Sequence, residues 1–258
     1  MGRFISNFDT TAEFATFSAT TAYSEPHVTL IKDGTGINFI PNLYNGHDFV
    51  EIGGLKWATM NVGANSVTDT GLYFQWGDTQ GYTASQVGSG EGQKYFGWAD
   101  YKYNSGGTSP SSADMTKYNS TDGKTVLEIS DDAATSSWGN NWRMPTTAEF
   151  QALGNACKFI DASGTEITGS NKLTTLSGVT GIYLEDKTDS SKRLFFPAAG
   201  GCGNGSVVSV GSLGYCWSSS LRSNETNAYT LSFDRYGVGW GSSNLRCYGY
   251  SVRGILDE

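Results

Sequence analysis

The feature that most constrains the fold is the spacing of large apolar residues over positions 195–258. They stand there as isolated anchors between Gly, Ser, Tyr, Asn, Arg and Cys, a pattern of neither a long amphipathic helix nor a buried parallel strand. The anchors are Phe195, Phe196, Trp217, Leu231, Phe233, Trp240 and Val252. Residues 228–233 alternate with period two, which predicts a strand with Leu231 and Phe233 on one face. We therefore expect short strands and ordered loops that display Tyr, Ser, Gly and Asn, the composition of evolved binding loops.

Length and composition limit the class of protein. The 258 residues provide room for one large domain with an appendage or for two small domains. Charged residues make up only 16% and glycine occurs 34 times, but 13% aromatic residues is too many for a disordered chain, so we expect strands and turns to prevail over helices.

Charge and hydropathy narrow the expected partners. The net charge is −8 and Lys and Arg are scattered singly, so nucleic acid is not an expected partner. No run of about 18 apolar residues is present, so no membrane insertion is expected. Residues 1–11 lack the apolar core of a secretory signal, which leaves open that a leader has been removed.

Residues 1–45 differ in composition from the rest and are expected to form an N-terminal β-rich arm. The apolar segments 28–30 and 37–39 flank Asp33-Gly34, a turn typical of a β-hairpin. A lone hairpin is only marginally stable in water, so we expect this arm to serve attachment to a partner or oligomerisation.

Residues 46–258 are expected to form the second domain. Strands are predicted at 49–52 and from Leu55, joined by a Gly53-Gly54 turn, and again at 72–78. Residues 79–137 show no clear periodicity and are expected to be an ordered insertion held by its aromatic residues. Alternation after residue 160 predicts a hairpin that turns at 187–190.

One helix and a shorter second one are expected. Thr146 is a good N-cap residue, Glu149 completes a capping box, and apolar residues then recur at helical spacing to about Lys158. A shorter helix is predicted near residues 131–136, with Asp131 and Asp132 in its first turn.

Six segments, taken in order, resemble a known family. They are HDFVEIGGLKWATMNVGA, GLYFQWGD, DDAATSSWGNNWRMPTTAEFQAL, LFFPAAG, CWSSS and GYSVRGI. Together they resemble the Fibrobacter succinogenes major paralogous family, whose domains are similar to formylglycine-generating-enzyme-like domains. The resemblance implies an α+β, C-type-lectin-like fold over about 46–258, with short antiparallel strands, one or two helices and long ordered loops. Within the family, the chain looks most like a variable protein of a diversity-generating retroelement from gut Bacteroidales or their phages.

That resemblance implies a division of labour within residues 201–250. Adenine-directed mutagenesis in such systems randomises Asn-type codons, and the residues expected from it dominate the positions between the anchors. The implied scaffold is Trp217, Ser218, Ser219, Ser220, Leu231, Phe233, Trp240, Arg246, Ser251, Val252 and Arg253. The implied ligand-binding set is Cys202, Asn204, Ser209, Ser212, Tyr215, Arg222, Asp234, Arg235, Tyr236, Ser242, Ser243, Leu245, Tyr248 and Tyr250. We expect replacement of Tyr236 and Tyr248 by Ala to leave thermal stability nearly unchanged.

Catalytic and cofactor sites are not expected. The four cysteines form no CxxC pair and are expected to be free thiols, although a disulfide among Cys202, Cys216 and Cys247 is an alternative. The two histidines, His27 and His47, are too few for a three-histidine zinc site and more typical of strand ends.

Two further motifs are weak. The GxGxG run at 201–205 precedes no helical pattern, so a turn-rich loop is favoured over a dinucleotide site. Asn224, Glu225 and Asn227, or Asp131 with Asp132, lack the full oxygen set of a calcium site, although structural calcium elsewhere stays open.

The expected function is non-enzymatic ligand binding through a diversified C-terminal surface. The expected ligand is a protein or glycan on a bacterial surface, with the N-terminal arm mounted on a phage virion, since SEPHVTLIKDG looks similar to segments of phage structural proteins. Homo-oligomerisation is an open alternative for the arm. The alternatives are a bacterial cell-surface adhesin or lipoprotein, a formylglycine-generating-type oxidase, and a calcium-dependent lectin.

Overall fold

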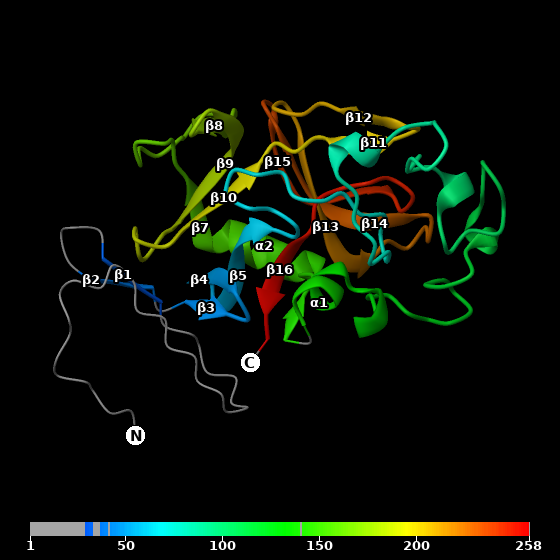
Figure 1. Cartoon of the computed structure of the whole chain (residues 1–258), viewed down its shortest axis with the longest axis horizontal. Helices are drawn as coiled ribbons and strands as arrows, with labels where there is room; N and C mark the ends of the chain where they lie inside the picture. Colours follow the sequence, from blue (N-terminus) through cyan, green and yellow to red (C-terminus); the bar gives the residue numbers. More distant parts are fainter. Residues whose placement is uncertain (1–28, 33–36, 41, 140, 258) are drawn as a thin grey trace, which may run out of the picture. The chain divides into compact units, whose positions relative to one another are not determined.

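The computed structural model describes residues 29–32, 37–40, 42–139 and 141–257. Strands account for 40% of the described residues and helices for 13%. The paired strands among them run antiparallel, and Figure 1 shows the few helices among the strands. The expected predominance of strands is confirmed, and the architecture is consistent with the α+β class. The chain divides into two compact units, residues 1–49 and 50–258.

The first unit contains the predicted hairpin. Strands β1 (Thr29–Lys32) and β2 (Ile37–Ile40) pair antiparallel, with Lys32 opposite Ile37. The predicted Asp33-Gly34 turn and His27 lie outside the described residues. A second tight turn, Asn45-Gly46, joins β3 (Leu43–Tyr44) to the start of β4 (His47–Ile52), and both turn residues have positive φ. Attachment or oligomerisation through residues 1–45 stays a prediction.

The last strand of the second unit joins two earlier strands into one sheet. Strand β16 (Arg253–Leu256) lies between β5 (Leu55–Asn61) and β6 (Trp142–Arg143), so that Ile255 pairs with both Trp57 and Arg143. Figure 1 shows β16 beside β5. The Gly53-Gly54 turn between β4 and β5 forms as predicted, with both residues at positive φ. Segments nearly 200 residues apart in sequence thus share one sheet.

Two further sheets complete the framework. Strand β9 (Val179–Asp186) pairs with β7 (Cys157–Phe159), β8 (Leu173–Leu176) and β10 (Arg193–Pro197). The chain between β9 and β10 contains the predicted turn at 187–190. Strand β14 (Asn227–Asp234) is the middle strand between β13 (Gly214–Leu221) and β15 (Gly237–Leu245). Leu231 and Phe233 are buried as predicted, but so is Thr230.

The predicted capping box begins the main helix. Helix α2 (Thr147–Ala156) has Thr146 as its N-cap, and Glu149 Oε2 accepts a hydrogen bond from Thr146 N at 2.6 Å. The prediction for the shorter helix needs correction. Helix α1 is Ala133–Trp138, and Asp132 is its N-cap, accepting from the amides of Ala134 and Thr135, while Asp131 lies in the preceding 3-10 turn.

The main core lies between α2 and the sheets. It consists of side chains from α2 and from strands of three sheets: Ile52, Trp57, Phe150, Leu153, Cys157, Ile182, Leu184, Leu194, Phe196, Ala198, Cys216, Leu231, Phe233 and Ile255. A Cβ on Gly154 would lie 2.5 Å from the ring of Trp240, so this glycine lets β15 pack closely on α2. Trp240 is only half-buried but packs against the core.

The expected insertion is ordered, but the predicted strand before it is wrong. Tyr73 and Phe74 make only isolated bridges, to Tyr82 and Tyr250, and residues 72–78 form no extended strand. The insertion contains short 3-10 turns instead of long strands, among them η1 (Ala84–Gln86), η2 (Trp98–Asp100) and η3 (Ser112–Asp114). Edge-to-face ring contacts connect Trp98, Tyr101, Tyr103 and Tyr118 in series. Aromatic packing and isolated backbone bridges, such as Asn104 with Met115, together order this segment.

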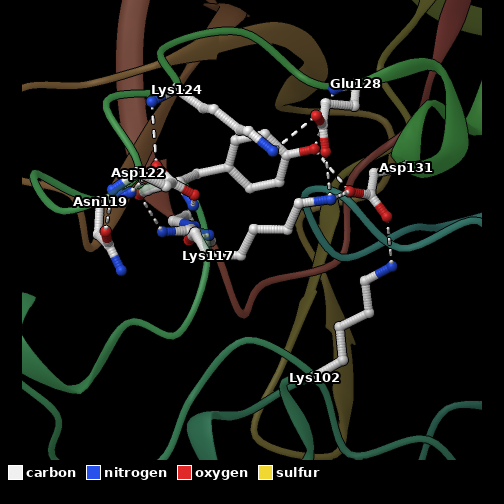
Figure 2. Close-up of polar contacts among 9 residues, drawn as sticks. Lys102, Lys117, Asn119, Asp122, Lys124, Glu128 and Asp131 are labelled. Atoms are coloured by element: carbon white, nitrogen blue, oxygen red, sulfur yellow. Dashed lines mark hydrogen bonds and ion pairs between the residues drawn. The ribbon is translucent and has the colours of Figure 1, made fainter.

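A charged network anchors the far end of the insertion. Asp131 accepts hydrogen bonds from Lys102, Lys117 and Tyr118, and Lys117 also pairs with Glu128 (Figure 2). Burial alone would raise the pKa of the Asp131 carboxyl, but hydrogen bonds from Lys117, Tyr103 and Tyr118 hold it well below its usual value. Both carboxylate oxygens of Asp131 are engaged in these contacts, so we do not expect this side chain to bind calcium.

Candidate functional site

Two adjoining hollows lie on the C-terminal part of the second unit. The first, about 330 Å³, is lined by Gly201, Cys202, Gly203, Asn204, Val208, Ser209, Leu213, Tyr215, Tyr248 and Tyr250. The second, about 300 Å³, is lined by Leu213, Tyr215, Ser232, Phe233, Asp234, Tyr236, Gly237 and Gly239. Leu213 and Tyr215 border both, so we call the pair the Tyr215 groove. Each hollow is at the lower end of the size range of small-molecule sites.

The groove brings together eight of the fourteen residues predicted to bind a ligand. These are Cys202, Asn204, Ser209, Tyr215, Tyr248 and Tyr250 in the first hollow, and Asp234 and Tyr236 in the second. The other six, Ser212, Arg222, Arg235, Ser242, Ser243 and Leu245, line neither hollow. Their role in binding, like that of the eight, stays a prediction.

The six residues outside the hollows make local contacts. Ser212 donates to the carbonyl of Ser209 at 3.0 Å, and Arg222 donates to Ser243 at 2.8 Å. Ser242 is hydrogen-bonded to Ser232 at 2.7 Å, while Leu245 packs on a small core cluster that contains Cys247. The Arg235 guanidinium lies 4.6 Å from the centre of the Tyr236 ring.

Two of the predicted display residues do not face water. The side chain of Cys202 is 1% exposed and packs with Tyr73 and Phe96, because its backbone is paired with Gly249. Tyr250 is 5% exposed, since its backbone is paired with Phe74. The expectation that these two side chains are displayed is therefore wrong, although both border the first hollow.

Glycines position the aromatic walls of the first hollow. Strands β11 (Gly201–Gly203) and β12 (Ser206–Val208) form a hairpin whose turn, Asn204-Gly205, has positive φ at both residues. A Cβ on Gly201 would lie 2.4 Å from the Tyr250 ring, and one on Gly203 would lie 3.1 Å from Tyr248. The GxGxG run therefore makes room for tyrosine rings, in a hairpin as its sequence context favoured.

Tyr215 forms the wall that the two hollows share. Its ring stacks on that of Tyr250 with centroids 4.5 Å apart and an interplanar angle of 22°. Tyr250 in turn contacts Tyr248 edge to face at 6.4 Å and Trp217 at 4.7 Å. Because Trp217 is fully buried and its Nε1 donates to the Phe74 carbonyl, the tyrosines rest on a fixed base.

The second hollow carries the only carboxylate that lines the groove. Asp234 Oδ1 accepts from the backbone amides of Tyr236 and Gly237 at 2.7 and 3.1 Å, which closes the β14–β15 turn. Tyr236, at the tip of this turn, is 72% exposed. The sequence did not predict that Val208, Leu213, Gly237 and Gly239 line the groove. The one sequence feature that could have indicated them is their position between the large apolar anchors.

The first hollow has no charged side chain. Burial raises the pKa of the Cys202 thiol to about 12, and burial also raises the pKa values of Tyr215 and Tyr250. These groups are therefore neutral at pH 7, and recognition there depends on ring faces and neutral hydrogen-bonding groups.

The cysteines have the environment of structural residues. All four are free thiols and buried, which confirms that prediction. Burial raises the pKa of each thiol to about 12. A reactive cysteine is instead partly exposed and has a lowered pKa.

The described residues offer few alternatives for chemistry. Among them, no group of three or more His, Cys, Asp or Glu side chains could hold a metal ion. Near the weak calcium candidate, the Asn224 amide donates to Asn227 Oδ1 at 2.9 Å. Burial lowers the pKa of His47.

A search of the described residues for a helix able to cross a membrane finds none. Comparison with family models, with curated proteins and with solved structures returns no match to this chain.

Proposed function

We propose that this chain is a non-enzymatic ligand-binding protein whose Tyr215 groove is the centre of a diversified C-terminal surface. The observation that carries the proposal is that eight of the fourteen residues chosen from sequence for their variable-looking character line two adjoining hollows with a common wall. Seven of the fourteen selected residues lie in β13, β14 and β15 or in the turn between β14 and β15, and the other seven lie in loops, turns and β11. They can therefore differ in chemistry while the anchors beneath them stay constant.

We further propose that residues 46–258 have a C-type-lectin-like fold. Support comes from the resemblance of the six sequence segments, from short antiparallel strands with few helices, and from a last strand that closes a sheet. Nine of the eleven scaffold residues implied by the resemblance, including Trp217, Leu231 and Arg246, are buried, and Ser220 and Trp240 are half-buried. A fixed interior under changeable loops is the arrangement that a diversified binding protein requires.

The absence of enzymatic activity is part of the proposal. Formylglycine-generating relatives depend on active-site cysteines, whereas the thiols of this chain are buried and have raised pKa values. No cysteine other than Cys202 borders the groove, and Cys202 is 1% exposed. These observations favour packing roles for the cysteines.

The origin of the diversity can be tested on DNA. We expect the gene to lie near a reverse transcriptase gene and a near-copy of the segment that encodes residues 201–250. Mismatches between the two copies should fall at adenines of the template. A near-copy without adenine-biased mismatches would contradict the retroelement origin.

The binding role can be tested on cells. We expect the purified, labelled chain to bind some strains in a panel of gut Bacteroidales, and the Tyr236→Ala variant to bind at least about tenfold more weakly, as hot-spot tyrosines do. Ile129→Ala is the matched control, because Ile129 is 68% exposed against 72% for Tyr236 and lines neither hollow. Equal loss in both variants, or binding to no strain, would count against the groove as the binding surface.

We propose that the arm, residues 1–45, attaches the domain to a phage virion, and that the ligand is on a bacterial surface. The similarity of SEPHVTLIKDG to phage structural proteins supports this attachment. Immunogold labelling of virions with an antibody to the chain tests it, and labelling of the host envelope alone would instead support the adhesin alternative.

A further inference from the structure

The first hollow contains hydroxyl groups that have no partner within the protein. Among the described residues, the phenol oxygens of Tyr215, Tyr248 and Tyr250 make no hydrogen bond, and neither do the side chains of Asn204 and Ser209. Tyr250 is only 5% exposed as a residue and still lines the hollow, and its hydroxyl is not among the buried polar atoms that lack a partner. These hydroxyl and amide groups make no hydrogen bond within the protein, so they are available to donate to and accept from a ligand that enters the hollow.

The residues that line the first hollow carry no charge that could bind an ionised ligand group. None of the ten lining residues is charged at pH 7, and two of them, Gly201 and Gly203, have no side chain. An ionised ligand group would lose hydration here without a countercharge among the ten lining residues, since the Asp234 carboxylate lines only the second hollow. The ligand group is therefore neutral.

The tyrosine rings that line the first hollow favour one kind of neutral ligand. Tyr215 and Tyr248 are partly exposed, and because the first stacks on Tyr250 and the second meets it edge to face, they present ring surfaces in two orientations. A pyranose ring has apolar C–H groups that can pack on a ring surface and hydroxyls that can donate and accept at the edges. A purely apolar group would leave all three phenols unpaired.

We infer that the first hollow binds a neutral pyranose unit of a surface glycan, through tyrosine rings and hydroxyls and without a metal ion. This inference rests on the proposed function and specifies its ligand. The site is preorganised, because Trp217 supports Tyr250 from below and the glycines of β11 fix the ring positions. A rigid site limits the entropy lost on binding.

The test is saturation-transfer NMR on the full chain with D-glucose, D-galactose, D-mannose and N-acetyl-D-glucosamine, each at millimolar concentration. At least one should bind, with the same affinity in EDTA. D-Glucuronate and D-glucosamine, which carry charges of opposite sign, should bind at least about tenfold more weakly than glucose if glucose is the sugar bound. No binding by any neutral sugar, stronger binding of either charged sugar, or loss of binding in EDTA overturns the inference.

Three variants locate the site without disturbing packing. Tyr250→Phe, Tyr248→Phe and Tyr215→Phe each remove only a hydroxyl, and each should weaken sugar binding by about three- to tenfold, the value of one hydrogen bond. Tyr229→Phe is the matched control, since Tyr229 is a partly buried strand tyrosine that lines neither hollow. Unchanged affinity in all three variants overturns the inference, and unchanged melting temperatures confirm that any loss is local.

The outcomes separate this inference from the proposed function. If cells are bound, Tyr236→Ala abolishes that binding, and protease treatment of the cells removes it while free sugars do not compete, then the ligand is a protein. The glycan inference then fails while the binding role stands. If sugars bind but no cell is recognised, the binding role fails instead.

Discussion

Arg246 donates from Nε to the hydroxyl of Tyr101 at 2.8 Å, and that hydroxyl donates to the carbonyl of Trp76 at 2.9 Å. The remaining guanidinium nitrogens donate to the carbonyls of Lys117, Tyr118 and Glu225. One fully buried side chain from the C-terminal region thus holds the insertion in place.

Replacement of Arg246 by Met should therefore destabilise the protein by about 3 kcal/mol, because several carbonyls lose their donors while the volume is roughly kept. Urea unfolding measures this loss. Arg246→Lys should recover little, since an ammonium group cannot match the planar fork. Arg222→Met is the control: Arg222 is exposed, and its replacement should change stability by less than about 0.5 kcal/mol. Similar losses for Arg222 and Arg246 would contradict this role.

Acid should weaken the insertion through Asp131. The pKa of its carboxyl is lowered in the folded protein, so its stabilisation is full above the unfolded value of about 4 and is lost as pH falls through the folded value. Asp131→Asn should cost about 2 kcal/mol at pH 7, and the variant should then lose less stability than the natural chain on acidification below about pH 4. Thermal unfolding at a series of pH values gives both numbers, and parallel pH profiles would exclude this contribution.

Gly181 should tolerate no side chain. A Cβ there would lie 2.2 Å from the carbonyl oxygen of Phe196, which is fixed in strand β10. We expect Gly181→Ala to destabilise by at least about 2 kcal/mol or to prevent folding. Gly169→Ala is a matched control, as a Cβ at Gly169 meets nothing within 4 Å, and it should be neutral or slightly stabilising. Equal melting temperatures for both variants would show that β9 and β10 can separate.

The four thiols should be unreactive in the folded protein. Their burial and raised pKa values leave almost no accessible thiolate at pH 7.5. An aromatic disulfide reagent should titrate none of the four within minutes, and all four after denaturation in guanidinium chloride. Rapid reaction of one thiol in the native state would identify an exposed cysteine and revive the oxidase alternative.

Tyr236 and Tyr248 should differ in their effect on stability, contrary to the expectation from sequence. Tyr236 is 72% exposed, so Tyr236→Ala should change the free energy of unfolding by less than about 0.5 kcal/mol. Tyr248 contacts Tyr250 and packs on the cluster around Tyr101 and Cys247, so Tyr248→Ala should cost about 1–2 kcal/mol. Chemical denaturation of both single variants decides this, and equal values would mean that the cluster repacks around the gap.

Local signals predicted the elements that depend on neighbouring residues. The capping box of Thr146 and Glu149 and the Gly53-Gly54 turn are set by positions a few residues apart, and the structure confirms both. The strand predicted at 72–78 failed because Tyr73 and Phe74 find their backbone partners at Tyr82 and Tyr250, one of them far along the chain.

The candidate site could be predicted only in part, because local composition indicates a region but not its long-range contacts. Composition pointed to the region and to Tyr215 and Tyr236, but Cys202 and Tyr250 were assigned to the surface. Their burial depends on pairing with Gly249 and Phe74, which no local pattern reveals. The adjacency of the two hollows likewise follows from tertiary packing around Tyr215.

The position of β16 also sets when the domain can be completed during synthesis. Residues 55–61 and 142–143 leave the ribosome long before 253–256, and their shared sheet lacks its middle until those last residues emerge. Until residues 253–256 are available, β5 and β6 lack their shared partner, and a product that stops before residue 253 would have an open sheet edge prone to aggregation.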